Sequence, residues 1–487
     1  MRIRLLSLLV WFFLASFPGN SQTTTSELKF DIGAVHKSAD ACQDFYQYAC
    51  GGWLKQHPIP ADRSYRDVYQ EMEEINDRRV AQILQQAESA PRNSEQRKVG
   101  DYYASCMDEK SIEAKGLAAL QPELERIDAM KTPQDFAREL ARIQSFGADA
   151  LFAMGADQKL EDATRVIAYL DQSGLNLPEP GYYTSQDADM QKARSGYEAH
   201  LEKVFALLGE SGEQAKVAAA DVLKIETALA QAELTPVERR DRKAWYHLMS
   251  ADLLETMAPD FAWKTYFAAI GFTPKGEMNV AVPKEILAIE DLARTTPMAA
   301  WKNYLRWELA RVATPALSKS FRYAEFDFYE RELRGVREPG SREKQCTDLT
   351  DRDLGEAVGK EYAARYFPPS SKQKVLAMVA RIKQAFRADI EQSTWMSAST
   401  KQEALRKLEV LRPMIGYPDH WRDYSQLEIK RGDALGNALR SEEFEFHRQL
   451  GKIGKPVDRG EFYELVQGVE GYHDNPLNII AFTAGIL

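Results

Sequence analysis

The sequence has 487 residues, of which 44% are hydrophobic and 28% are charged, an ordinary balance for a globular protein with about three domain-sized units. The formal net charge of -10 excludes a surface built to bind nucleic acid, because such a surface requires clustered Lys and Arg. An acidic balance of this size favours solubility instead.

The first residues have the pattern of an export signal. Arg2 and Arg4 precede an apolar run over residues 5–17, and residues 19–21 offer small side chains for cleavage. The run is shorter than the about 20 apolar residues that span a membrane. We therefore predict a signal peptide over residues 1–21, a secreted or periplasmic mature chain, and no stable membrane span after cleavage. A retained N-terminal anchor is the competing interpretation.

Four cysteines, Cys42, Cys50, Cys106 and Cys346, lie in the chain that would be exported. Export permits disulfides, and four cysteines allow three pairings that spacing alone does not distinguish. If residues 42–50 are helical, Cys42 and Cys50 are about 12 Å apart, which is too far for them to bridge each other. Free buried thiols are the alternative.

The body of the chain is predicted to be mainly helical. Three Thr-Pro pairs place a capping Thr before a Pro suited to the first helical position, and Ser399–Gln402 reads as a capping box before a helix over residues 402–410. The pairs are Thr132-Pro133, Thr235-Pro236 and Thr296-Pro297. Apolar stripes at helical spacing are expected to pack in the core. They are Phe136, Leu140 and Ile143; Tyr197, Leu201, Val204 and Leu208; and Val375, Met378, Val379, Ile382 and Phe386.

Strand signals are few. Residues 150–154 and 166–170 are predicted to form a hairpin, and residues 279–282 a short strand before Pro283. Near the C-terminus, the β-branched and apolar run over residues 479–482 predicts a buried strand.

No catalytic constellation is visible in the sequence. None of the seven histidines has another histidine four residues away, so an H-E-x-x-H zinc helix is absent. C-x-x-C spacing, a nucleophile elbow, a phosphate loop and a dinucleotide fingerprint are absent as well. His473 lies closest to the terminal strand, but a single histidine is more often structural than a ligand. The residues alone therefore name no catalytic group.

A series of short blocks in fixed order carries a family resemblance. The blocks are Ala41–Trp53, Tyr102–Asp108, Leu354–Gly359, Ile415–Pro418, Trp421–Tyr424 and Lys452–Arg459. Over nearly the whole mature length, the chain resembles the neprilysin and endothelin-converting-enzyme family of zinc metallopeptidases. Several independent blocks in the correct order are far more specific than any single motif.

The resemblance implies a mainly α fold, with a large helical covering lobe, small β elements and the start of a metallopeptidase catalytic lobe. Together with the export signal, it divides the sequence into four parts. Residues 1–21 are the signal peptide, 22–60 an N-terminal segment that packs on the catalytic lobe, 61–440 the helical domain, and 441–487 the start of the catalytic lobe, truncated.

The resemblance also implies the chemistry. Members of the family hydrolyse short peptides with a zinc ion held by an H-E-x-x-H helix and a downstream E-x-x-x-D segment. Both elements lie beyond the Ala-Gly-Ile-Leu block at residues 484–487. We therefore expect a fragment with no catalytic residue and no metal ligand of its own, inactive alone. Its expected partners are short peptides and the missing C-terminal segment of its own lobe.

Two other interpretations stay open. The chain is a non-catalytic peptide-binding or interaction module derived from the covering lobe, or an inactive partner that completes its fold with another polypeptide. The apolar terminal strand favours the fragment, since a mature short protein is expected to protect such an edge.

Single residues are assigned by the same resemblance. It pairs Cys106 with Cys346, and it expects partners for Cys42 and Cys50 in the missing C-terminal part.

The resemblance further places Glu470 and Gly471 on an edge strand, where the family has an Asn-Ala pair that hydrogen-bonds the substrate backbone. The backbone of Glu470 is expected to remain available to an extended peptide. Thr483 stands where the family has a Pro. We interpret these departures as neutral divergence, bearing on substrate specificity more than on family.

Overall fold

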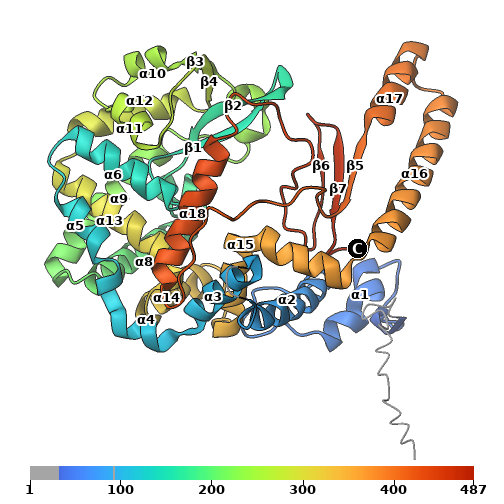
Figure 1. The fold of residues 1–487 in the computed structure, drawn as a ribbon, viewed down its shortest axis with the longest axis horizontal. Coiled ribbons are helices and arrows are strands. Elements are labelled where there is room, and N and C mark those ends of the chain that lie inside the picture. The colour runs from blue at the N-terminus through green and yellow to red at the C-terminus, as the bar shows by residue number, and fades with distance from the viewer. Residues whose placement is uncertain (1–31, 92–93) are drawn as a thin grey trace, which may run out of the picture. The chain divides into compact units, whose positions relative to one another are not determined.

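The computed structural model describes residues 32–91 and 94–487 (Figure 1). Contacts divide the chain into two units, residues 1–59 and 60–487. The predicted signal peptide lies outside the described residues. Among the described helices, none combines the length and the apolar character that a membrane span requires.

The smaller unit contains a 3-10 turn and one helix, η1 (Ile32–Ala34) and α1 (Phe45–Gln56). The Asp44 side chain accepts a hydrogen bond from the Gln47 N–H at 2.9 Å and so caps the start of α1. Cys42 precedes the helix and Cys50 lies within it, and both are free cysteines.

The larger unit is mainly helical, which confirms the predicted fold class. Most of its helices share one large core. Two 3-10 turns, η3 (Glu238–Arg240) and η4 (Arg242–Ala244), bury no residue. The helices that share the core are α4 (Glu109–Lys115), η2 (Gly116–Ala119), α5 (Gln121–Asp128), α6 (Pro133–Ser145), α7 (Gly181–Thr184), α8 (Ala188–Leu207), α9 (Gly212–Ala230), α10 (Ala251–Met257), α11 (Trp263–Ala269), α12 (Pro283–Thr295), α13 (Met298–Ala313), η5 (Thr314–Ala316), α14 (Lys319–Glu325), the π-helical η6 (Phe326–Glu332) and α18 (Ala434–Leu450). We call this set the helical lobe.

Local sequence explains how helices of this lobe begin and which face they bury. Thr132 caps the start of α6 as predicted and forms a capping box with Asp135, and Phe136, Leu140 and Ile143 are all buried. Other predicted starts are wrong. Thr296 ends α12, because Pro297 has extended backbone and α13 begins after it.

Two further predicted helix starts also differ from the structure. Thr235 exchanges hydrogen bonds with Glu238 in a turn and opens no α-helix. The N-cap of the helix predicted over residues 402–410 is Ser397 rather than Ser399, and its side chain accepts a hydrogen bond from the Thr400 N–H at 3.1 Å. A Ser-rich stretch offers several possible caps, and tertiary packing selects one of them.

A four-stranded sheet with the order β1-β2-β4-β3 packs in the helical lobe. The predicted hairpin is confirmed and has longer arms, β1 (Phe152–Lys159) and β2 (Asp162–Gln172). The predicted strand before Pro283 is β4 (Glu277–Val280), which pairs with β2 in parallel and with β3 (Leu248–Ser250) in antiparallel fashion.

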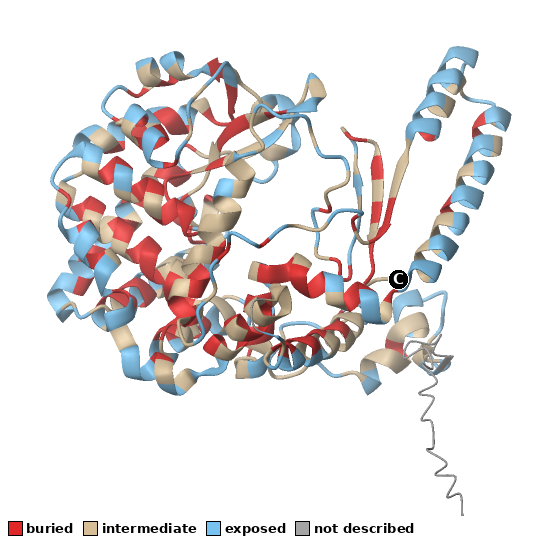
Figure 2. Ribbon diagram, viewed as in Figure 1, coloured by how far each residue is buried: buried red, intermediate tan, exposed pale blue. Residues whose placement is uncertain are grey.

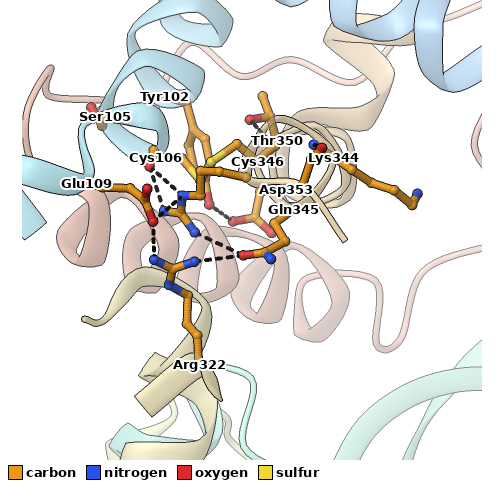
Figure 3. Close-up of a disulfide and its surroundings, with 12 residues drawn as sticks. Tyr102, Ser105, Cys106, Glu109, Arg322, Lys344, Gln345, Cys346, Thr350 and Asp353 are labelled. Atoms are coloured by element: carbon orange, nitrogen blue, oxygen red, sulfur yellow. Dashed lines mark hydrogen bonds and ion pairs between the residues drawn. A yellow bond between two sulfur atoms is a disulfide. The ribbon is translucent and has the colours of Figure 1, made fainter. Parts of the chain in front are cut away.

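A second core lies between α2 (Val68–Ala87), α3 (Glu95–Met107) and α15 (Arg342–Tyr366), which we call the three-helix platform. Gly100 permits α3 to approach α2 closely, because a Cβ there would lie 2.3 Å from the Ala87 carbonyl carbon. The structure contains the Cys106–Cys346 disulfide that the resemblance implies, joining α3 to α15 inside this core (Figure 3).

Polar side chains surround the disulfide. The Arg342 guanidinium donates two hydrogen bonds to the Cys106 carbonyl oxygen, at 3.1 and 2.6 Å from Nε and an Nη. Arg322 pairs with Glu109, and Tyr102 donates to Asp353 (Figure 3). The bridge therefore sits in a network that connects the platform to α14 of the helical lobe.

The rest of the larger unit is a helical hairpin, α16 (Pro369–Gln392) and α17 (Ala398–Val410), followed by a three-stranded sheet. The sheet has the order β5-β7-β6, with β5 (Arg412–Gly416) parallel and β6 (Gly471–Asp474) antiparallel to β7 (Ile479–Thr483). The predicted terminal strand is confirmed as β7, and it lies at the centre of its sheet.

The apolar stripe of α16 is not core, contrary to the prediction. Val379 is buried, but Met378, Ile382 and Phe386 are exposed, and Trp395 after the helix is 80% exposed (Figure 2). Helical periodicity identifies a face that needs covering but not the element that covers it. Among the described residues, nothing buries this face.

Replacing both bridged cysteines, Cys106→Ala with Cys346→Ala, is expected to lower the free energy of unfolding by about 2–5 kcal/mol, because the bridge constrains a long loop of the unfolded chain. Denaturant unfolding measures the change. The matched control replaces the two free cysteines, Cys42→Ala with Cys50→Ala, and is expected to leave the stability of the platform unchanged. Equal losses in the two variants would contradict the prediction.

Candidate functional site

The candidate site has two parts: β6, the edge strand of the three-stranded sheet, and a cavity beside α18. The strand is positioned by the platform. Asn76 of α2 is buried, and its side-chain amide donates to the Gln467 carbonyl at 3.1 Å and to the Gly485 carbonyl at 3.0 Å. One side chain thus holds both the loop before β6 and the end of β7.

Further contacts of the same loop complete this attachment. The side-chain oxygen Oδ1 of Asn76 accepts a hydrogen bond from the Tyr362 hydroxyl of α15 at 2.6 Å. The Gln467 side chain donates to the Gly355 carbonyl of α15 at 3.1 Å. The sheet is therefore docked on two helices of the platform, α2 and α15, through hydrogen bonds of buried side chains.

The open side of β6 presents backbone groups. Glu470 faces Thr483 across the ladder, and its carbonyl accepts from the Thr483 N–H at 3.1 Å. Hydrogen-bonded pairs alternate along an antiparallel ladder, so the N–H and C=O groups of Gly471 and His473 point away from β7. Among the described strands, none pairs with that side.

This geometry revises one expectation for Glu470. Its N–H donates to the Thr483 hydroxyl at 3.1 Å, and its carbonyl accepts from Thr483 as well. The Glu470 backbone is thus engaged within the sheet, and the residue offers only its exposed side chain. Gly471, the other predicted residue, does present its backbone to the open side, and a Cβ there would lie 2.8 Å from the Phe482 ring.

Thr483 has a structural role that a Pro would not perform. It is fully buried, and its hydroxyl donates toward the Gly468 carbonyl at 2.6 Å and the Glu470 carbonyl at 3.0 Å. A Pro would also remove the backbone N–H that bonds to Glu470. The Thr that stands here in place of the family Pro therefore stabilises the loop before β6.

A cavity of about 950 Å³ lies between α18 and the segments on either side of it. Its walls come from residues 418–428, from the second half of α18 and from residues 452–462. Acidic and basic side chains occur in nearly equal numbers among its lining residues, and the surface between them is largely apolar. Trp421 and Phe444 supply apolar surface.

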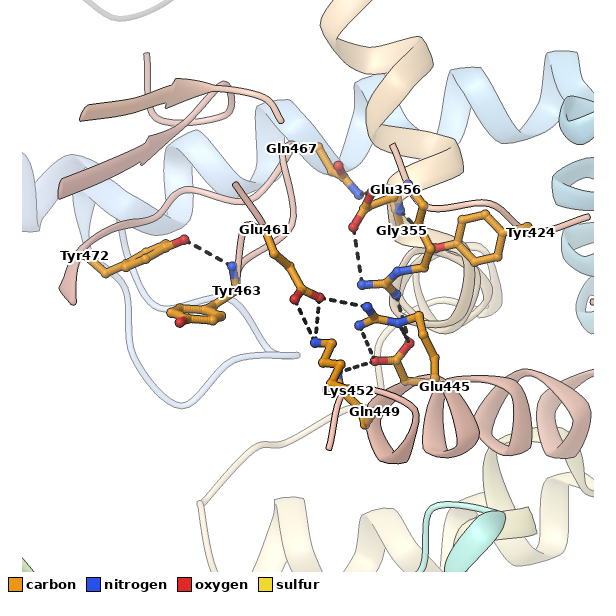
Figure 4. A network of polar contacts seen from close by, with 12 residues as sticks. Gly355, Glu356, Tyr424, Glu445, Gln449, Lys452, Glu461, Tyr463, Gln467 and Tyr472 are labelled. Carbon is orange, nitrogen blue, oxygen red and sulfur yellow. Dashed lines mark hydrogen bonds and ion pairs between the residues drawn. The ribbon is translucent and has the colours of Figure 1, made fainter. Parts of the chain in front are cut away.

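An ion-pair network spans one wall of this cavity (Figure 4). Arg448 pairs with Glu445 at 2.7 Å and with Glu461 at 2.8 Å, and Lys452 pairs with Glu461 at 2.7 Å. Although burial opposes ionisation, hydrogen bonds from Lys452 and Arg448 hold the pKa of Glu461 below its ordinary value. The network ties the end of α18 to the segment that leads to β6.

Arg422 extends the network to the platform. Its guanidinium pairs with Glu445 at 3.1 Å and with Glu356 of α15 at 3.3 Å, and its backbone N–H donates to Glu356 at 2.7 Å. Sequence reasoning used the blocks around Trp421 and Lys452 for the resemblance but did not predict these ion pairs. The sequence signal that could have predicted these ion pairs is the helical spacing of Glu445, Arg448 and Lys452.

The hairpin of the helical lobe reaches the same segment. Val166 of β2 donates to the Lys455 carbonyl at 3.0 Å and accepts from the Gly454 N–H at 2.9 Å. Near the end of β6, the Gln158 side chain lies 3.5 Å from the Asp474 carboxylate. The segment between α18 and β6 therefore forms an isolated antiparallel bridge with the hairpin, between Arg165 and Pro456.

Comparison with known proteins identifies the family. A sequence model described as Peptidase family M13 matches residues 41–418. The chain belongs to peptidase family M13. Human endothelin-converting enzyme-like 1 is 30% identical over 486 residues, which cover 94% of this chain and 62% of that protein. The endothelin-converting enzyme homolog of Locusta migratoria is 28% identical, with 94% and 66% covered.

Solved structures agree with this M13 assignment. The zinc metalloprotease Zmp1 of Mycobacterium tuberculosis, in complex with an inhibitor, superposes with a TM-score of 0.88 at 31% identity, covering 94% of this chain and 69% of that one. PepO from Lactobacillus rhamnosis superposes with a TM-score of 0.83 at 21% identity, which bears on the fold alone. The M13 chain spans 62% of the length of its human relative.

The zinc ion implied by the M13 family has no matching set of ligands here. Over residues 32–91 and 94–487, no group of three or more His, Cys, Asp or Glu side chains is arranged to hold a metal ion. His473 lies exposed on β6. The described residues of this chain therefore do not form a zinc site.

Thr483→Val keeps the shape of the side chain and removes its hydroxyl. The variant is expected to lose about 1–3 kcal/mol of unfolding free energy, because the Gly468 carbonyl loses a donor and the Glu470 N–H loses its acceptor. Hydrogen exchange of residues 468–471 is expected to become faster. Thr483→Ser retains the hydroxyl and serves as the control. A Val variant as stable and as protected as the Ser variant would contradict the role assigned to Thr483.

Proposed function

We propose that this M13 chain supplies the covering lobe and the substrate-binding edge strand of an exported zinc endopeptidase that hydrolyses short peptides. The observation that carries the proposal is the open side of β6, where Gly471 and His473 point backbone N–H and C=O groups outward. An extended peptide added to this side gains main-chain hydrogen bonds, with its side chains free to set specificity.

Glu470 and Gly471 are the proposed substrate-binding residues. Glu470 begins the edge with an exposed carboxylate, which accepts hydrogen bonds but donates none when ionised. A peptide that offers a donor or a positive charge at this position is therefore favoured. Gly471 contributes its backbone, and the Phe482 ring beside it leaves no room for a larger side chain.

The zinc ligands are proposed to come from polypeptide outside these residues, in the same lobe. The exposed apolar face of α16, formed by Met378, Ile382 and Phe386, supports this, because exposed apolar patches of this kind mark contact surfaces. The free Cys42 and Cys50 are proposed to pair with cysteines of that polypeptide after export. On this proposal the chain alone binds no zinc and cleaves no peptide.

A non-catalytic peptide-binding module is the second candidate. The open side of β6 serves binding without hydrolysis equally well, and the described residues hold no metal site. The two functions differ in whether a zinc-bearing segment belongs to the same protein.

Incubation with short peptides is expected to slow hydrogen exchange at residues 471–473, and no cleavage is expected with or without added zinc. His473→Pro removes an outward N–H that makes no ladder bond, so peptide-dependent protection is expected to fall at least about tenfold, the equivalent of about 1.4 kcal/mol. His473→Ala keeps the N–H and serves as the control. Equal protection in the two variants would contradict binding at this edge.

The coding DNA that follows the codon of Leu487 separates the enzyme from the binding module. For the enzyme, we expect an open frame that encodes an H-E-x-x-H helix and an E-x-x-x-D segment. The longer product is then expected to cleave peptides and to lose activity in a chelator. A stop codon, with intact protein of this length in the exported fraction, would favour the binding module instead.

A further inference from the structure

Two carboxyl groups are sealed inside the helical lobe, away from β6 and the cavity. Glu226 of α9 is 0% exposed and Glu308 of α13 is 1% exposed. The side-chain amide of Asn176 donates one hydrogen bond to each of them, at 2.8 Å to Glu226 and 2.9 Å to Glu308. A single nitrogen atom therefore joins the two carboxyl groups.

Neighbouring elements supply further donors to one member of the pair. The Tyr183 hydroxyl of α7 donates to Glu226 at 2.7 Å, and the Tyr197 hydroxyl of α8 donates to its other oxygen at 2.8 Å. Glu226 thus accepts three hydrogen bonds and is built to carry charge. Glu308 shares only the Asn176 amide with it.

Few positive charges face the pair. Arg311, one turn after Glu308 on α13, is the cation that favours ionisation of both groups. The other ionisable groups around them are carboxyl and phenol groups. The carboxylates disfavour a second negative charge on the pair, and the phenols are neutral. They are Asp149, Glu233, Tyr304 on α13, Tyr329 on η6 and Glu325 on α14.

The geometry limits the pair to one negative charge. Two acceptors of one amide nitrogen lie about 5 Å apart, since its hydrogens diverge by about 120°. Two ionised carboxylates at that separation, without water and with one cation, repel strongly, so one of them holds a proton. The two groups then titrate as a unit.

We propose that Glu226 and Glu308 share one proton near neutral pH, and that loss of this proton in alkaline medium loosens the packing of α7, α8, α9 and α13. The pair makes the helical lobe a pH-sensitive element that is held most tightly in a mildly acidic medium.

The direction of the effect follows from the pKa values. Burial raises the pKa of Glu226 to about 7 and that of Glu308 to about 8, above the ordinary value of 4.5 that each recovers on unfolding. The stabilisation is therefore complete below about pH 4.5 and is lost as the pH rises through about 7–8.

Glu308→Gln tests the proposal, because the amide keeps the shape and removes the charge. Compared with the natural chain, the variant is expected to unfold at least about 2–4 °C higher at about pH 8.5, and at the same or a lower temperature at about pH 5.5. Glu198→Gln, at an exposed position on α8, is the control and is expected to change neither value. A Glu308→Gln variant that is less stable by the same amount at both pH values would overturn the proposal.

Infrared spectroscopy of the natural chain observes the proton directly. A band of a buried protonated carboxyl group is expected at about pH 6, disappearing by about pH 9. It is expected to be absent at both pH values from the double variant Glu226→Gln with Glu308→Gln. Hydrogen exchange of α9 and α13 is expected to accelerate over the same pH range. A band that persists unchanged at about pH 9 would overturn the proposal.

Discussion

The buried amide of Asn76 holds together the parts of the molecule on which the site depends. It binds the Gln467 and Gly485 carbonyls at once, so the loop before β6 and the end of β7 are both anchored on α2. A short three-stranded sheet with two edges is marginal by itself, and docking on the platform gives it a fixed position. This docking keeps the outward backbone groups of β6 in one position, which the proposed binding of an extended peptide requires.

Charge plays opposite roles in the two halves of the larger unit. Around the cavity, Arg448 and Lys452 neutralise Glu461, and the pKa of that carboxyl falls despite its burial. In the helical lobe, Glu226 and Glu308 face one arginine between them, and burial raises both pKa values. Local cation supply, rather than burial alone, decides whether a buried acid is charged.

The exposed face of α16 shows how far helical periodicity predicts burial. The relatives are longer than this chain, and α16 carries an apolar stripe that no described element covers. Helical periodicity identified the stripe but wrongly predicted that it packs in the core. Periodicity is a property of one helix, whereas burial is a property of a pair of elements.

Short-range patterns determined much of this protein from sequence alone: the mainly helical class, the capping Thr132 before Pro133, the hairpin, the terminal strand and, through ordered blocks, the family. The family resemblance placed Glu470 and Gly471 at an edge strand, and of the two only Gly471 lies within β6. Tertiary structure alone decided that the Glu470 backbone turns inward to Thr483, that Arg422, Arg448 and Glu461 line one cavity, and that Asn176 joins two distant carboxyl groups. Such contacts join residues far apart in the chain, so they depend on how whole elements pack, and no local period records that.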